Sequence, residues 1–384
     1  MSGFEFATTR RIICADGAAK HLPQYASSLG ITHAFIVTDQ GLRASGVLDH
    51  VLAAFVGSGV EATVFNGVVA DPPEHSVHGA VAMARAAGID GVIGLGGGSS
   101  LDTAKLVALL LGSPQTLPSM YGIGLAHGPR LPLLQVPTTA GTGSEVTAIA
   151  IVTTPSGEKK GVVSDVLYAD LAVLDATLTV ALPTRVTAMT GIDAMVHAIE
   201  AYTSKHKKNV LSDSLAVRAL QLLSNNLLPV LADGHNLDAR RAMLQGSLLA
   251  GMAFANAPVA AVHALAYPLG GHFHVPHGLS NVLVLLPVLE FNLASANALY
   301  GELASTLMRD NVAVAPIASG RAFVDAMDAL VGDVGLERTL RAVGVDESHL
   351  SLLATDAMKV QRLLVNNPRQ VTYDDALAIY RAVL

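Results

Sequence analysis

Four polar residues in the second half of the chain have types and spacings suited to binding a divalent metal ion. Asp193 and His197 lie four residues apart in an otherwise apolar helical pattern, so their side chains share one helix face. A carboxylate buried on such a face is costly unless a cation accompanies it. His263 follows in another helical pattern, and His277 stands in a Pro-His-Gly turn before a third. One carboxylate and three imidazoles complete a divalent site with an open position, suited to Fe(II) or Zn(II).

Each of these histidines, taken singly, is better explained as a hydrogen-bonded core residue, and only the four positions together favour a metal site. Glu200 completes an i, i+7 face with Asp193 and is a candidate to support the metal ligands from behind.

A glycine cluster in the first half has the context of an anion-binding site. The stretch LGGGSSLDTAK, residues 95–105, follows a buried-strand pattern and opens into a helical one. Glycines let backbone N–H groups approach a phosphate closely, and the first turn of a helix adds unpaired donors. The spacing predicts Ser99 as the N-cap residue, with Asp102 completing a capping box. A tight strand-to-helix turn without a ligand is the alternative. The candidate cofactor contacts are Gly97, Gly98, Ser99 and Ser100.

A second polar loop, PTTAGTGS at residues 137–144, directly follows a strand pattern, at the end where ligands of open α/β sheets bind. Its hydroxyl and amide groups are suited to ribose or phosphate, and a solvated loop is the alternative. The candidate contacts are Thr138, Thr139, Thr142 and Ser144. Asp39 ends an earlier strand pattern, where a carboxylate would accept hydrogen bonds from an adenosine ribose and repel a 2′-phosphate, which favours NAD over NADP. An ordinary Asx turn explains Asp39 equally well.

The elements that must position these residues differ between the two halves of the chain. The first half alternates short apolar strands with helical patterns, which predicts a parallel sheet covered by helices. The predicted strands are residues 34–38, 62–65, 91–95 and 133–136. Residues 148–154 and 161–163 flank a Pro-Ser-Gly turn and predict a hairpin beside that sheet.

After residue 182 the strand patterns nearly disappear. Helical periodicity instead covers residues 184–203, 212–231, 239–255 and 279–294. We therefore expect an α/β domain over residues 1–182 and an all-helical domain over residues 183–384.

Composition excludes several classes of protein. The chain has 384 residues, of which 51% are apolar and 14% charged, so it can build a large core. A formal net charge of −7 and only short basic clusters argue against nucleic acid as a partner. The apolar runs at residues 106–111 and 282–289 are shorter than a membrane span, and no membrane partner is expected. The single cysteine, Cys14, fits a cytoplasmic protein.

Together these segments are similar to the iron-containing alcohol dehydrogenase family, the metal-dependent group III dehydrogenases, along nearly the whole chain. The matching elements are GGGSSLDTAK, PTTAGTGSEVT, the DxxxH pair of Asp193 and His197, the later His263, and the PHG element at His277. The resemblance implies a Rossmann-like NAD-binding domain, a helical metal and substrate domain, an active cleft between them and a homodimer. It further implies that Lys160 lies near the cofactor and Phe254 near the substrate.

The chain departs from the family pattern at three positions. Many members carry a histidine, proposed to act in proton transfer, where this chain has Tyr267. The hydroxyl of Tyr267 either relays a proton as a catalytic group or only shapes the pocket. Asp71 and Ile149 stand where asparagines are expected, so cofactor contacts there are altered.

The favoured hypothesis is a metal-dependent oxidoreductase that transfers a hydride reversibly between an alcohol, or a hydroxyacid, and NAD. Within the same family, a maleylacetate-reductase-like or a hydroxyacid-oxoacid transhydrogenase-like enzyme is the alternative. A dehydroquinate-synthase-like lyase would need a basic cleft, which the apolar surroundings of Phe254, Ala255 and Val262 do not supply. A non-catalytic nucleotide- or metal-binding protein is the last alternative.

Overall fold

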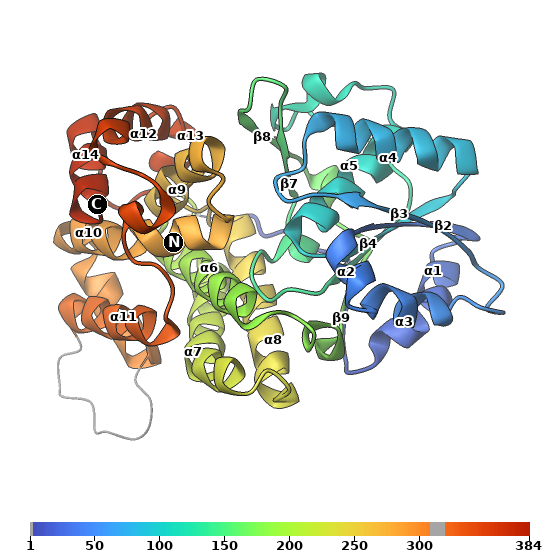
Figure 1. Ribbon diagram of the computed structural model, residues 1–384, viewed down its shortest axis with the longest axis horizontal. Helices are drawn as coiled ribbons and strands as arrows, with labels where there is room; N and C mark the ends of the chain where they lie inside the picture. The colour runs from blue at the N-terminus through green and yellow to red at the C-terminus, as the bar shows by residue number, and fades with distance from the viewer. Residues whose placement is uncertain (1–2, 308–318) are drawn as a thin grey trace. The chain divides into compact units, whose positions relative to one another are not determined.

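The computed structural model describes residues 3–307 and 319–384, and the chain separates into two compact units. Ala7–Leu182 form an α/β unit, and Pro183–Leu384 form a helical unit (Figure 1). Residues 3–6 group with the helical unit, although the first domain was expected to begin at residue 1. These residues precede the first strand and belong to no sheet, so no backbone ladder ties them to the α/β unit.

Six parallel strands form the main sheet of the α/β unit, in the order β1-β9-β6-β4-β2-β3. They are β1 (Ile12–Cys14), β2 (His33–Asp39), β3 (Glu61–Val68), β4 (Gly91–Gly96), β6 (Leu133–Pro137) and β9 (Leu171–Leu174). The four predicted strands are confirmed as β2, β3, β4 and β6. The sequence pattern does not predict β1 and β9, which are only three and four residues long.

Helices cover both faces of this sheet. They are α1 (Leu22–Ser28), α2 (Gln40–Ala44), α3 (Val47–Ala53), α4 (Glu74–Ala87) and α5 (Gly98–Gly112). Successive strand residues point to opposite faces: Phe35 of β2 joins the core beneath α4 and α5, and Ile36 joins the core with α1 and α3. Figure 1 shows α4 and α5 on one side of the sheet and α1 and α3 on the other. Burial on both faces explains the continuous apolar runs of the central strands.

The strand order reverses between β2 and β4. From β2 the chain continues to β3 on one side, and from β4 it continues to β6 on the other. Open α/β sheets bind ligands at the carboxyl ends of the strands that flank such a reversal. In this sheet those ends are Asp39 and Gly96.

The predicted hairpin is confirmed as β7 (Ile149–Thr153) and β8 (Lys159–Val163), which are antiparallel. A two-residue strand, β5 (Gly122–Ile123), extends it to a second sheet of three strands.

The helical unit contains no strand among its described residues. Its helices are α6 (Thr184–Thr203), α7 (Val210–Ala232), α8 (Leu237–Asn256), α9 (Ala261–Phe273), α10 (His277–Leu307), α11 (Gly320–Val334), α12 (Leu350–Ala357), α13 (Gln361–Leu364) and α14 (Tyr373–Ala382). The four predicted helical segments are confirmed as α6, α7, α8 and α10, although α10 extends well beyond its predicted end. Helix α6 packs against α7, α8 and α10, so almost all of its residues from Thr187 onward are buried.

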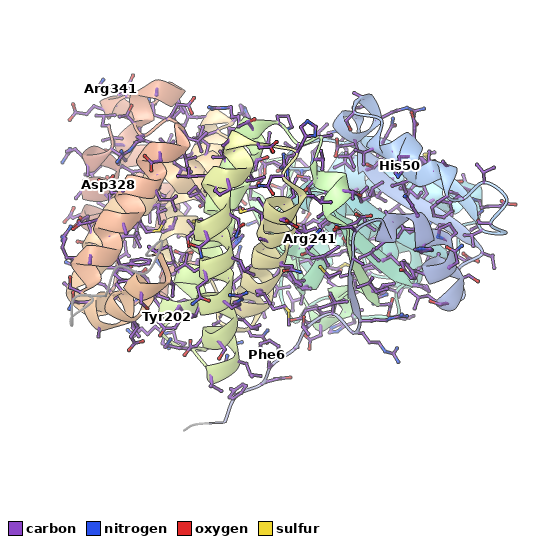
Figure 2. The ribbon with its side chains drawn as sticks, turned by 90° about the horizontal axis from the view of Figure 1, so that it is seen from below. Phe6, His50, Tyr202, Arg241, Asp328 and Arg341 are labelled. Atoms are coloured by element: carbon purple, nitrogen blue, oxygen red, sulfur yellow. The ribbon has the colours of Figure 1, made fainter. Side chains whose placement is uncertain are left out.

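Two of these helices, α7 and α10, are long and apolar enough by composition to cross a membrane. The short apolar runs in the sequence do not reveal this property. In the structure, α7 packs against α6 and α8, and α10 packs against α6, α9 and α11. In the most apolar stretches of α7 and α10, 39% and 44% of the residues are buried inside the structure. Figure 2 draws the described side chains as sticks.

Candidate active site

The glycine loop enters helix α5 earlier than the sequence predicts. The helix begins at Gly98 with Gly97 as its N-cap residue, so the predicted N-cap role of Ser99 and its capping box with Asp102 are wrong. Strand β4 ends at Gly96, whose φ of +150° turns the chain at once toward the helix, a conformation that favours glycine. No side chain caps the helix start. Its first N–H groups therefore lack a side-chain acceptor, which is the condition that suits an anion.

The glycine loop packs against the loop that follows β6. A Cβ atom added to Gly98 would lie 2.8 Å from Cγ2 of Thr142, and the Thr138 amide donates to the carbonyl of Gly96 at 3.0 Å. Two strands that pair side by side, β4 and β6, bring these loops together. These loops and the first turn of α5 contain the predicted cofactor residues Gly97, Gly98, Ser99, Ser100, Thr138, Thr139 and Thr142.

Asp39 lies beside the glycine loop at the end of β2. One of its carboxylate oxygens accepts the Leu42 N–H at 3.0 Å and caps α2. The other oxygen accepts a hydrogen bond from the Ser100 hydroxyl at 3.4 Å. The structure therefore shows the Asx-type turn, with the same carboxylate next to the candidate phosphate site. Contact between Asp39 and a ribose stays a prediction.

Ser144 takes part in a buried network that the sequence does not predict. Its hydroxyl donates to Asp102 at 2.6 Å and accepts from the Lys105 ammonium at 2.8 Å. Lys105 is fully buried and also donates to the Thr147 hydroxyl and the Ile149 carbonyl. These contacts fasten the loop after β6 to α5 through the Ser144 hydroxyl, the group expected to contact the cofactor.

Burial shifts the ionisation of this network. It raises the pKa of Asp102 and lowers the pKa of Lys105, and in each case the opposite charge of the other residue acts against the shift. Burial also raises the pKa of Glu145 to about 7, against the opposing effects of its own backbone hydrogen bond and of Lys105. One carboxylate oxygen of Glu145 has no hydrogen-bond partner among the described atoms.

Lys160, expected near the cofactor by resemblance, lies on β8. Its ammonium pairs with Glu158 at 2.8 Å and is about half exposed. Its cofactor contact stays a prediction. Asp71 has a positive φ of 50°, which Asp tolerates better than most residues, and its carboxylate pairs with Lys159 at 2.7 Å.

Three of the predicted metal ligands converge inside the helical unit. Asp193 on α6, His263 on α9 and His277 at the start of α10 offer ligand atoms that all lie within 4.8 Å of one another. Oδ1 of Asp193 is 3.7 Å from Nε2 of His263 and 3.6 Å from Nε2 of His277. Gly278 permits this approach, because a Cβ atom there would lie 2.6 Å from the carbonyl oxygen of Met189 on α6.

The fourth predicted ligand, His197, lies at the edge of this cluster. Its Nε2 is 3.9 Å from Oδ1 of Asp193. Its ring stacks on His263 at 4.7 Å between centroids and on Phe254 of α8 at 4.3 Å. Phe254, the predicted substrate residue, therefore forms an apolar wall against a predicted ligand.

Asp193 is buried and nevertheless held as a carboxylate. Burial alone would raise its pKa, but the charges of His197, His277 and His263 and a hydrogen bond from Asn281 outweigh that effect, so its pKa lies below the usual value. Metal binding requires this deprotonated form.

Glu200 orients one of the imidazoles. Its carboxylate accepts the Nδ1–H of His263 at 2.7 Å and the backbone N–H groups of Ala260 and Val262 at 2.9 and 2.7 Å. It thereby holds the start of α9 and leaves Nε2 of His263 with its lone pair toward the cluster. The sequence proposal that Glu200 supports the ligands agrees with this geometry.

Asn281 is a member of the cluster that sequence reasoning missed. It is fully buried on α10, and its Nδ2 lies 2.6 Å from Oδ1 of Asp193 and 3.4 Å from Nε2 of both His263 and His277. Its own Oδ1 has no partner among the described atoms. Its position four residues after His277, on the same helix face, is the signal that would have identified it.

Tyr267 borders the same cluster. It lies one turn after His263 on α9, and its ring centroid is 6.1 Å from that of His277. Its hydroxyl accepts a hydrogen bond from Nη2 of Arg362 at 3.3 Å. Sequence reasoning missed Arg362, because no motif connects it with a residue 95 positions earlier.

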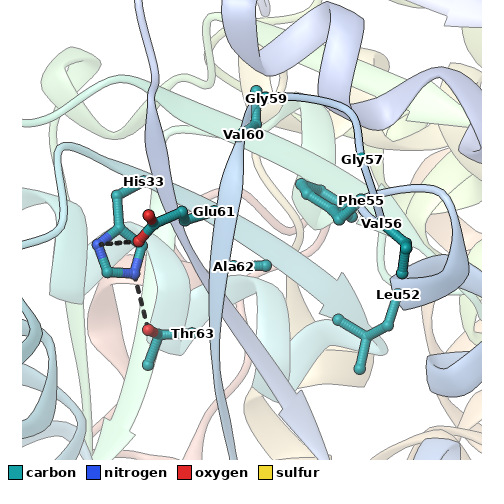
Figure 3. Close-up of a pocket in the computed structure, with 10 residues that line it drawn as sticks. All are labelled: His33, Leu52, Phe55, Val56, Gly57, Gly59, Val60, Glu61, Ala62 and Thr63. Atoms are coloured by element: carbon teal, nitrogen blue, oxygen red, sulfur yellow. Dashed lines mark hydrogen bonds and ion pairs between the residues drawn. The ribbon is translucent and has the colours of Figure 1, made fainter.

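A surface pocket of about 670 Å³ lies elsewhere, on the α/β unit (Figure 3). It is lined by residues at the beginnings of β2 and β3, including His33, Glu61 and Thr63, and His33 bonds to Thr63 at 2.8 Å. Ligands of such sheets bind at the opposite, carboxyl ends of the strands. We therefore assign this pocket no part in the candidate site.

Two family models match the chain. The model described as iron-containing alcohol dehydrogenase matches residues 9–176, and the model described as the C-terminal part of the Fe-containing alcohol dehydrogenase family matches residues 187–384. Long-chain-alcohol dehydrogenase 1 of Geobacillus thermodenitrificans (strain NG80-2) is 40% identical over 369 residues, which is 95% of this chain and 93% of that protein.

Solved structures are similar over essentially the full length. A 1,3-propanediol oxidoreductase superposes with a TM-score of 0.95 at 32% identity, with 100% of both chains covered. A sulfoacetaldehyde reductase from Bifidobacterium kashiwanohense in complex with NAD⁺ superposes with a TM-score of 0.90 at 28% identity, covering 100% of this chain and 99% of that one.

Proposed function

Because the chain belongs to the iron-containing alcohol dehydrogenase family, we propose that it catalyses reversible hydride transfer between an alcohol, or a hydroxyacid, and NAD. The observation that carries the proposal is the convergence of Asp193, His263 and His277 on one buried point of the helical unit. The reaction also requires a site for NAD, and the α/β unit offers the start of α5, which no side chain caps, beside the Asp39 carboxylate.

The donor set fits a divalent transition metal. A carboxylate and imidazoles are ligands that Fe(II) and Zn(II) accept, and the hydrogen bond from Nδ1–H of His263 to Glu200 leaves the lone pair of Nε2 for the ion. We assign Asp193, His197, His263 and His277 as the ligands and Fe(II) as the native ion. When bound, the ion supplies Lewis acidity toward the substrate oxygen, and NAD supplies the hydride acceptor.

The residues of the α/β unit bind and orient the cofactor. The backbone N–H groups at the start of α5 and the hydroxyls of the loop after β6 receive the pyrophosphate. The carboxylate of Asp39 accepts hydrogen bonds from the adenosine ribose and repels a 2′-phosphate, which favours NAD over NADP.

The residues around the metal ligands shape the substrate side. Phe254 stacks on His197 and presents an apolar wall, and Tyr267 stands beside His277. We assign Tyr267 to pocket shape rather than proton relay, because water or ribose hydroxyls suffice to take the substrate proton.

The names of similar proteins cover both neutral and anionic substrates, from long-chain alcohols and 1,3-propanediol to sulfoacetaldehyde. Family resemblance therefore supports an alcohol or aldehyde without selecting one. It also supports a cytoplasmic homodimer, which size-exclusion chromatography with light scattering would reveal as a mass of about twice 39.6 kDa.

The proposal is tested with protein loaded anaerobically with Fe(II) or Zn(II) and assayed for NADH with a panel of alcohols and hydroxyacids. We expect steady NADH production by the wild type and its loss, together with the bound metal, in Asp193→Ala. A metal-loaded protein that binds NAD but reduces none with any member of the panel contradicts the proposed reaction.

A further inference from the structure

Arg362 brings a positive charge to the edge of the cluster of candidate metal ligands, which are Asp193, His197, His263 and His277. Its guanidinium donates to the Tyr267 hydroxyl at 3.3 Å and lies 5.9 Å from the centroid of the Tyr267 ring. The Tyr267 ring is in turn 6.1 Å from the ring of His277. One aromatic ring therefore separates the guanidinium from a candidate metal ligand.

The backbone that carries Arg362 is fixed relative to the ligand helices. The buried side chain of Asn366 donates to the carbonyl of Arg362 and to that of Val259, both at 3.1 Å. Val259 stands two residues before α9, which carries His263 and Tyr267. The carbonyl of Asn366 also accepts the Lys205 N–H at 2.8 Å. Short helix α13 is thus attached to the same framework as the metal cluster.

The charge of Arg362 has no carboxylate within ion-pair distance among the residues that the structure describes. Asp356, the acid that precedes Arg362 in the sequence, is paired with His272 at 2.6 Å and Lys359 at 2.6 Å. Across the described ranges, 3–307 and 319–384, the guanidinium has one polar partner, the hydroxyl of Tyr267. Since the Tyr267 oxygen accepts from Arg362, its own hydrogen is directed elsewhere, and no acceptor for it is found within the described part of the chain.

We propose that Arg362 and Tyr267 form a subsite for an anionic group of the substrate, a carboxylate or a sulfonate at the far end of a short alcohol or aldehyde. The proposal rests on the proposed function, because it places the reacting oxygen at the metal ligands. A guanidinium presents several N–H donors in a planar fork that matches an oxyanion, and the phenol hydrogen adds one more. The spacing suits a short chain, whose charged end reaches Arg362 while its other end lies beside His277.

The test compares three aldehydes of equal chain length that end in a carboxylate, a sulfonate or a methyl group. We expect the wild type to prefer the anionic aldehydes, as measured by kcat/KM. In Arg362→Met the preference for anionic over methyl-ended substrate should fall about 10²-fold, because the charge-assisted hydrogen bonds from the guanidinium are lost. Arg362→Lys should retain part of the preference, because it keeps the charge but not the fork. The carboxylate and sulfonate arms identify which oxyanion the subsite accepts.

Tyr267→Phe separates the subsite from a proton relay. If the hydroxyl binds the anion, the loss appears mainly in KM and mainly for the anionic aldehydes. A fall of about 10²-fold in kcat for all three aldehydes, with unchanged metal content, would instead identify a relay and overturn the assignment of Tyr267 to the subsite.

Calorimetry of the metal-loaded enzyme with a non-reactive short carboxylate gives a readout that does not need turnover. Binding that is lost in Arg362→Met supports the subsite. Equal binding by wild type and variant, or a wild type that prefers the methyl-ended aldehyde, overturns it while leaving the dehydrogenase reaction intact. Absence of turnover with every aldehyde and with every member of the alcohol and hydroxyacid panel would refute the proposed function, and calorimetry would still decide the subsite.

Discussion

At the scale of single residues, two buried side chains, Glu200 and Asn281, support the candidate metal ligands without being among them. Glu200 contacts no candidate ligand atom directly, yet it fixes the tautomer of His263 and the start of the helix that carries it. Asn281 directs its amide nitrogen at the point where three ligand atoms converge. These two residues give separate predictions.

Glu200→Gln should weaken metal binding by roughly 10- to 100-fold, the usual effect of removing a carboxylate behind a ligating histidine. The amide has nearly the same shape, but it no longer provides an anionic acceptor for the Nδ1–H of His263. Titration with Co(II), followed by its visible spectrum, measures the affinity. Glu302→Gln is the matched control, because Glu302 is also a carboxylate of the helical unit but accepts from Tyr202. Equal Co(II) affinity in all three proteins would exclude an orienting role for Glu200.

Asn281→Leu should destabilise the metal-free protein by about 1–3 kcal/mol, because Asp193 loses a buried hydrogen-bond donor. The metal-loaded form should lose less, since the ion then compensates the carboxylate. In thermal unfolding experiments, Zn(II) should therefore raise the Tm of Asn281→Leu by more than it raises the Tm of wild type.

Asn292→Leu serves as the control for Asn281, because Asn292 is also buried on α10 but pairs with Asn367. It should lower the Tm of both forms by similar amounts. If Asn281→Leu also lowers the Tm of the metal-free and metal-loaded forms by similar amounts, Asn281 is only a packing residue.

At the scale of elements, the start of α5 packs closely against the loop after β6, and we expect this packing, rather than a side-chain cap, to govern NAD binding. Gly98→Ala places a Cβ atom 2.8 Å from Cγ2 of Thr142, so one of the two loops must move. We expect the dissociation constant for NAD to rise about tenfold or more, since overpacking of this kind costs about 1–3 kcal/mol. Isothermal titration with NAD measures it.

Two further variants control for the Gly98 substitution. Gly79→Ala adds a methyl group inside α4, where a Cβ atom would meet nothing within 4 Å, and should leave NAD binding as it is. Adding Thr142→Ser to Gly98→Ala removes the crowded methyl group and should restore part of the affinity. A double variant no better than Gly98→Ala would show that the loop contact does not govern binding.

Elements with a long or strongly periodic pattern were predictable from the sequence, and short ones were not. The apolar runs of β2, β4 and β6 are buried on both faces, so their composition alone identifies them. Strands β1, β5 and β9 have two to four residues and depend on neighbouring strands for their ladders. The N-cap was misplaced because Ser99 fits the capping pattern, whereas the actual start of the helix depends on the backbone conformation of Gly96.

The candidate site was predictable where a motif placed residues on one helix and not where the fold brought distant helices together. Asp193 and His197 are four residues apart, so helical geometry alone pairs them. Arg362 meets Tyr267 only because Asn366 ties α13 to the segment before α9. No local pattern encodes that contact.

At the scale of the whole molecule, one buried acid couples stability to pH. The pKa of Glu145 is about 7 in the folded protein, above its ordinary value of 4.5. The folded state therefore holds its proton more tightly than the unfolded state, and this group's contribution to stability is complete below pH 4.5 and lost as pH rises toward 7.

Glu145→Gln mimics the protonated form and should remove this dependence. The variant should match wild type near pH 4.5 and exceed it above pH 7 by at most about 3 kcal/mol, since each pKa unit corresponds to about 1.4 kcal/mol. Urea unfolding of both proteins at several pH values measures the difference, and groups common to both proteins cancel. A difference that does not change with pH would contradict the raised pKa.

The hydrogen bonds around Glu200 have a consequence for the supply of metal in the cell. They position His263 and the start of α9 through contacts within the chain alone, so the ligands stand ready once the polypeptide has folded. An ion that enters the folded protein would therefore meet a His263 that is already oriented, and competing ions would meet the same donors. For such nitrogen and oxygen donors Zn(II) binds more tightly than Fe(II). The ion carried by the enzyme will therefore report the balance of zinc and iron around it, and a cell that uses it with iron must keep available zinc scarce.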